Sequence, residues 1–66
     1  MEHRDCNLWH YLMDHEFLIE QQKLHAVYRV LQEMGLPPTI DMTLTATECQ
    51  QVLEQAKRYL ALWEFS

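Results

Sequence analysis

The chain has 66 residues, of which 48% are hydrophobic and 23% are charged, a balance that predicts one small folded domain over residues 1–66 and argues against disorder. Ten acidic against five basic residues give a formal net charge of −5, which disfavours nucleic acid and anionic membranes as partners because both require a basic surface. The sequence contains neither a membrane-spanning apolar run nor a signal-peptide pattern, so we expect a cytoplasmic protein.

The first predicted element is one long helix over about residues 7–34. This stretch lacks Gly and Pro and is rich in residues of high helix propensity. Asp5 and Asn7 are candidate N-caps, and Gly35, which two prolines follow shortly, is typical of a helix end.

The apolar residues of this helix form two stripes, which together cover about 200° of its surface, roughly twice what one packing neighbour needs. The first stripe is Leu8, Leu12, Ile19, Ala26 and Val30, and the second is Trp9, Met13, Phe17, Leu24, Val27, Leu31 and Met34. We expect an all-α antiparallel helical hairpin that covers the second stripe itself. The first stripe would then form a homodimer interface, and two hairpins would make a four-helix bundle.

An alternative is a break in the first helix near Asp14 and His15, after which the N-terminal piece folds back over the core. No Gly or Pro marks such a break, which favours the continuous helix.

In the continuous version, residues 8–15 extend beyond the shorter second helix and have no partner within the chain. Trp, Tyr and Met are residue types that interfaces favour. Leu18 adds an apolar side chain to the polar face, close to Tyr11. The predicted partner contacts in this region are Trp9, Tyr11, Leu12, Met13 and Leu18.

The connection after the first helix combines loop residues with a strand-like alternation. Pro37 and Pro38 favour an extended backbone, and Ile40, Met42 and Leu44 then alternate with polar residues. This apolar edge either packs against the end of the bundle or contacts a partner, in which case Ile40 and Met42 belong to the binding surface.

The second predicted helix covers about residues 46–64. Thr45 and Glu48 match the capping-box pattern at its start. Its apolar residues form a single stripe at three- and four-residue spacing, which predicts one packing neighbour. The stripe is Cys49, Val52, Leu53, Ala56, Tyr59, Leu60 and Trp63.

Cys6, His10 and Asp14 would align on one side of a helix that reached back to Cys6, and all three are zinc-ligand types. A solvated polar face explains the same pattern, so we predict no metal and no other cofactor. In the hairpin, Cys6 and Cys49 would lie several turns apart, too far for a disulfide, which agrees with reduced thiols in the cytoplasm.

No nucleophile, phosphate-binding or metal-hydrolase motif is found in the sequence, and we predict that the protein is not an enzyme. The surplus apolar surface instead predicts a small acidic interaction module, a regulator, inhibitor or co-chaperone, that binds another protein of unknown identity. The alternative is a metal-binding or metal-sensing module that uses Cys6, His10 and Asp14.

Overall fold

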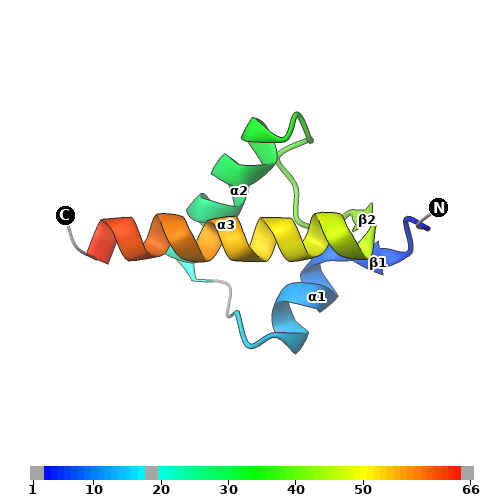
Figure 1. Cartoon of the computed structure of the whole chain (residues 1–66), viewed down its shortest axis with the longest axis horizontal. Coiled ribbons are helices and arrows are strands. Elements are labelled where there is room, and N and C mark those ends of the chain that lie inside the picture. The colour runs from blue at the N-terminus through cyan, green and yellow to red at the C-terminus, as the bar shows by residue number, and fades with distance from the viewer. Residues whose placement is uncertain (1–2, 18–19, 65–66) are drawn as a thin grey trace.

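The computed structural model describes residues 3–17 and 20–64, and for residues 63 and 64 it describes the backbone only. The described residues form three helices and one small antiparallel sheet (Figure 1). In chain order the elements are β1 (Cys6–Asn7), α1 (Leu8–Asp14), α2 (Gln21–Glu33), β2 (Thr43–Leu44) and α3 (Ala46–Glu64). The predicted helical class is confirmed, with a short sheet added.

The predicted continuous helix over 7–34 is wrong, because the chain leaves the helix after Asp14 and re-enters it at Gln21. Glu16 adopts a left-handed backbone with φ of 58°. The Phe17 amide donates to the Leu12 carbonyl at 2.9 Å, and the Glu16 amide donates to the Met13 carbonyl at 3.0 Å. These two bonds form a Schellman motif, which satisfies the last carbonyls of α1 and reverses the chain.

The alternative of a break near Asp14 and His15 therefore describes the chain. The N-terminal piece folds back, and α1 lies against α3 on the opposite side from the upper part of α2 in the view of Figure 1. The predicted antiparallel hairpin is not confirmed, because α2 runs obliquely to α3 (Figure 1). The connection over residues 34–45 carries β2 and is long enough to permit this crossing.

The other predicted helix boundaries are confirmed. Gly35 has a φ of 76° and ends α2 in a second Schellman motif, with the Leu36 amide donating to the Leu31 carbonyl at 2.8 Å and the Gly35 amide donating to the Gln32 carbonyl at 3.1 Å. Asn7 is the N-cap of α1, and its Oδ1 accepts from the His10 amide at 3.1 Å.

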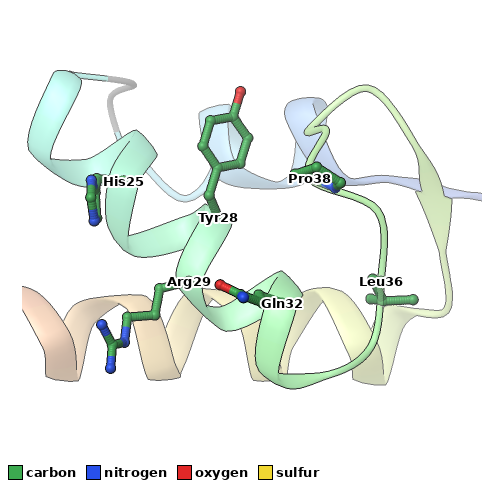
Figure 2. A pocket seen from close by; sticks show the side chains of 6 residues that line it. All are labelled: His25, Tyr28, Arg29, Gln32, Leu36 and Pro38. Atoms are coloured by element: carbon green, nitrogen blue, oxygen red, sulfur yellow. The ribbon is translucent and has the colours of Figure 1, made fainter.

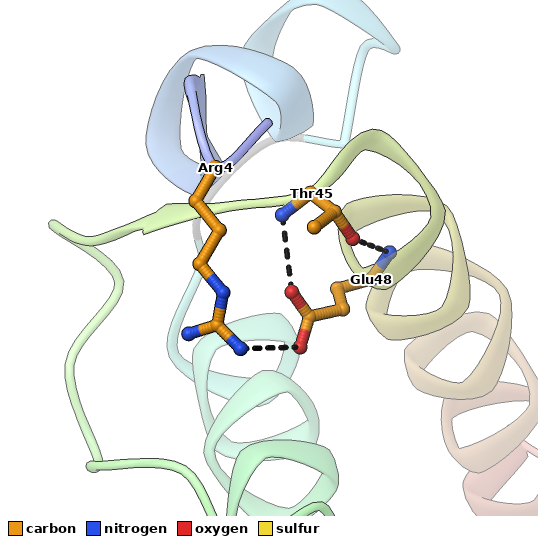
Figure 3. A network of polar contacts seen from close by, with 3 residues as sticks. All are labelled: Arg4, Thr45 and Glu48. Atoms are coloured by element: carbon orange, nitrogen blue, oxygen red, sulfur yellow. Dashed lines mark hydrogen bonds and ion pairs between the residues drawn. The ribbon is translucent and has the colours of Figure 1, made fainter. Parts of the chain in front are cut away.

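The start of α3 is the predicted capping box (Figure 3). The Thr45 hydroxyl accepts from the Glu48 amide, and the Glu48 carboxylate accepts from the Thr45 amide, both at 3.1 Å. The second carboxylate oxygen of Glu48 lies 4.0 Å from the guanidinium of Arg4. This network connects the residues before β1 to the first turn of α3.

One core unites all three helices. Within the described residues, the buried apolar side chains are Leu8, Leu12, Phe17, Ala26, Val27, Val30, Leu31, Leu44, Cys49, Val52, Leu53 and Ala56. The four described members of the predicted dimer interface, Leu8, Leu12, Ala26 and Val30, are all fully buried in this core, and Ile19 lies outside the described residues. Because the chain covers these four residues itself, they offer no exposed apolar surface to a second copy, and the four-helix dimer is not confirmed.

The apolar edge of the connection packs against the protein's own core. Leu44 is buried, and Ile40 and Met42 are half-buried against the same cluster. β2 pairs with β1 in the register Cys6 to Leu44 and Asn7 to Thr43, and the Leu8 amide extends the ladder to the Met42 carbonyl at 2.9 Å. Of the two interpretations of this edge, the structure therefore matches the intramolecular one.

Candidate interaction surface

Helix α1 has one buried and one exposed apolar face. Leu8 and Leu12, one turn apart, are fully buried and anchor the helix on the core. Trp9 and Met13 are also one turn apart, but their side chains are 40% and 43% exposed. Leu8 and Leu12 pack into the core and hold α1 in place, while Trp9 and Met13 lie on its exposed side. We call Trp9 and Met13 the α1 surface.

The other residues predicted to contact a partner are distributed differently. Leu12 is fully buried and serves the core, Tyr11 is half-buried, and Ile40 and Met42 pack against the core. Leu18 lies outside the described residues. The structure thus separates two exposed side chains from four that the fold itself uses.

Tyr11 packs against His15 at the C-terminal end of α1. The two rings stack with centroids 4.1 Å apart and planes 30° from parallel, and the His15 Nδ1 lies 2.9 Å from the Tyr11 carbonyl oxygen. Partial burial is the main reason why the pKa of the Tyr11 hydroxyl is raised above its ordinary value. Its place against the core argues for a structural role.

A groove that the sequence analysis did not find lies along α2 (Figure 2). Its volume is about 610 Å³, and its lining residues are His25, Tyr28, Arg29, Gln32, Leu36 and Pro38. The four lining residues from α2 lie outside its apolar stripe, so the spacing of apolar residues in the sequence does not predict a groove there. The available hint was composition, since Tyr and Arg are enriched in interfaces.

Arg29 at the edge of this groove is held by neighbours on both helices. Its Nε lies 3.8 Å from the Glu33 carboxylate, and its guanidinium lies 5.7 Å from the centroid of the Tyr59 ring on α3. The Tyr59 hydroxyl donates to Glu33, and this hydrogen bond is the main reason why the pKa of Tyr59 is raised. Glu33 and Tyr59 thus fix the position of the Arg29 side chain at the edge of the groove.

The candidate metal ligands do not form a site. Cys6 belongs to β1 and not to a helix, so it is out of line with His10 and Asp14 on α1. No group of three His, Cys, Asp or Glu side chains within residues 3–17 and 20–64 is arranged to hold a metal ion. The one-sided alignment required a helix that reached back to Cys6, and α1 begins only at Leu8.

The two cysteines, in contrast, are neighbours, which corrects the prediction that they lie several turns apart. The Cys49 thiol donates to the Cys6 carbonyl at 3.6 Å, and both residues are free thiols. Burial first, and then the adjacent Cys6 side chain, raise the pKa of the Cys49 thiol to about 12. The reversal at Glu16 is what brings the N-terminal strand to the start of α3.

No helix in the described part of the chain combines the length and apolar character needed to cross a membrane. The chain matches no protein-family model, and neither a curated protein nor a solved structure is significantly similar to it.

Proposed function

We propose that the protein is a non-catalytic interaction module, a regulator, inhibitor or co-chaperone, that binds a partner protein through the α1 surface. The observation that carries this proposal is the exposure of Trp9 and Met13, side by side on a helix whose opposite face is anchored in the core. Neither side chain is needed to fix α1, because Leu8 and Leu12 already do so.

The residue types support binding. Trp is among the residues most enriched in interface hot spots, and truncating a hot-spot side chain typically weakens binding by about 2 kcal/mol or more. Met adapts its shape to irregular apolar pockets. A short, anchored helix also loses little conformational entropy on binding, which favours affinity.

The charge of the chain indicates the kind of partner. Asp14 and Glu16 are exposed next to the α1 surface, and the formal net charge is −5. A partner with an apolar pocket surrounded by basic side chains would be complementary, and the charges would accelerate association at low salt.

Affinity purification from the native cell, with the folded chain as bait, tests the proposal. The variant Trp9→Ala/Met13→Ala should lose the captured partner, with a loss of at least tenfold in affinity, about 1.4 kcal/mol, once the partner is purified. Leu62→Ala is the matched control, because Leu62 is 65% exposed and lies near the end of α3. Circular dichroism of each variant verifies that the fold is retained.

Two results would contradict this assignment. Retention of the partner by Trp9→Ala/Met13→Ala excludes the α1 surface. Loss of the partner in Tyr28→Ala/Gln32→Ala, with the first variant still binding, would move the binding site to the groove on α2, because both residues line that groove.

A second copy of the chain is one partner that the same surface can take. A homodimer of this kind would pair two α1 surfaces instead of the buried first stripe. Sedimentation equilibrium at micromolar concentration distinguishes a monomer from a dimer, and Trp9→Ala/Met13→Ala should shift a dimer to the monomer. We also propose a cytoplasmic location, in which reduced cysteines persist.

A further inference from the structure

The Cys49 thiol reaches the backbone carbonyl of Cys6, 43 positions away in the sequence, where β1 passes the first turns of α3. Cys6 pairs with Leu44 in the sheet, and the chain then continues through Thr45 into α3, which turns Cys49 back toward Cys6. The contact therefore depends on two fixed features, the ladder register and the capping box. It is not a chance encounter of two flexible side chains.

The geometry is compatible with a covalent bond. The Cys49 sulfur lies 3.6 Å from the Cys6 carbonyl oxygen, and a carbonyl oxygen is about 2.4 Å from its own Cα, so this sulfur is within about 6 Å of the Cys6 Cα. A disulfide forms between residues whose Cα atoms are up to about 7 Å apart, so the bond requires the Cys6 thiol to reach a sulfur that already lies beside the Cys6 backbone.

We propose that Cys6 and Cys49 are a dithiol that small-molecule disulfides oxidise reversibly to an intramolecular disulfide, which locks β1 onto α3. This proposal does not depend on the function of the α1 surface.

The two thiols differ in access, which sets the order of the steps. Cys6 is half-buried and Cys49 is fully buried. The Cys6 thiolate attacks the small disulfide, forms a mixed disulfide and releases one small thiol. The Cys49 thiolate then attacks the Cys6 sulfur and displaces the second small thiol.

The exchange is balanced. Two protein thiols and one small disulfide become one protein disulfide and two small thiols. The protein sulfurs lose two electrons, the small disulfide gains them, and the two protons end on the released thiols. The second step requires the Cys49 thiolate, which is scarce at neutral pH because burial raises the pKa of this thiol.

The bond would change the stability of the protein more than its shape. It would close a long loop that contains α1, α2 and β2, and so restrict the unfolded chain strongly. Because β1 leads directly into α1, the same bond would prevent α1 from leaving the core.

Incubation of the folded chain with oxidised and reduced glutathione tests the proposal. We expect a monomer with no free thiols and a cross-linked tryptic peptide pair that joins residues 5–23 to residues 30–57. The Tm should rise by about 10 °C or more and return to its initial value with dithiothreitol.

The single-cysteine variants complete the test. Cys49→Ala should stop at one glutathionyl group on Cys6, and Cys6→Ser should keep its buried Cys49 unmodified. If Cys49→Ala does not fold, the Cys6→Ser variant and the cross-linked peptide pair are sufficient to test the proposal. Two free thiols after oxidation, a stable glutathione adduct on Cys6 of the natural sequence, or disulfide-linked dimers would each overturn the proposal.

Discussion

The ends of α1 and α2 have the same hydrogen-bond pattern but different residues at the position that requires a left-handed backbone. After α2 that residue is Gly35, with φ of 76°, and after α1 it is Glu16, with φ of 58°. Gly adopts this conformation without steric cost, whereas a residue with a side chain loses about 1 kcal/mol. One helix end is thus favoured locally, and the other has to be stabilised by contacts made elsewhere.

The end of α1 is stabilised by the two residues whose backbone groups form the outer hydrogen bond of its Schellman motif, Leu12 and Phe17. Leu12 is fully buried and Phe17 is 4% exposed, and both belong to the core. Burying two side chains of this size contributes about 3–6 kcal/mol in total, which exceeds the cost of the left-handed Glu16. At the end of α2, Leu36 is only half-buried, which suffices because Gly35 adds no strain.

The largest effect is expected from removing the packing that stabilises the end of α1. Phe17→Ala should lower the free energy of unfolding by about 3–4 kcal/mol, because it leaves a cavity in the core. Leu36→Ala, the equivalent position after α2, should lower it by about 1 kcal/mol because that side chain is half-buried. Urea unfolding measures both, and equal losses would contradict the comparison.

Substitutions at the two left-handed positions, Gly35 and Glu16, test how much the backbone conformation alone contributes to the stability of each helix end. Gly35→Ala should lower the free energy of unfolding by about 1–2 kcal/mol. A Cβ at this position meets no atom within 4 Å, so the loss would come from the backbone and not from a clash. Gly35→Asn is the control, since Asn tolerates this conformation better than Ala, and it should lose less.

The reverse exchange should stabilise the protein. Glu16→Gly relieves the left-handed strain but increases the freedom of the unfolded chain, and the net gain should be about 0.5 kcal/mol. Glu16→Ala, which removes the carboxylate but keeps the strain, should show no such gain. A loss of stability in Glu16→Gly would show that the Glu16 side chain makes a contribution beyond its backbone conformation.

The start of α3 differs from the ends of α1 and α2 because a charged side chain, the Glu48 carboxylate, stabilises it. The Thr45 amide, which donates to the Glu48 carboxylate, is the main reason why the pKa of Glu48 is lowered from 4.5, and Arg4 adds to this. A lowered pKa means that the ionised form stabilises the fold. This stabilisation is present above pH 4.5 and is lost as the pH falls through the lower folded value.

The expected result is a small fall of the urea midpoint on acidification below pH 4.5, part of which is absent in Glu48→Gln. Glu16→Gly and Gly35→Ala should keep the full acid dependence, because the hydrogen bonds of both Schellman motifs join backbone groups only. An unchanged acid dependence in Glu48→Gln would show that other carboxylates dominate.

The sequence allowed α3, the end of α2 and the apolar edge of the connection to be predicted, because Thr45, Glu48 and Gly35 act through local rules. It did not reveal the reversal at Glu16, since a Glu in a left-handed conformation has no composition signal. Two predictions depended on a chain without this reversal. The dimer interface assigned to Leu8 and Leu12 lies in the core, and the predicted separation of the cysteines is wrong. Most of the apolar surplus of residues 7–34 is covered within the chain, whereas Trp9 and Met13 stay exposed.

Of the predicted partner residues, Trp9 and Met13 remain exposed because their side of α1 faces away from the core once α1 folds back. The groove on α2 depends on how Leu36 and Pro38 return beside the helix, which no local pattern in the sequence specifies.

The ladder between β1 and β2 also has a consequence for synthesis. β1 needs Thr43 and Leu44 as partners, and α1 packs on α3, so neither can be completed until the last third of the chain is made. α2 and α3, in contrast, are close in sequence and can pair as soon as both have emerged. Among the described elements, β1 is therefore synthesised first but cannot pair until β2 has been made.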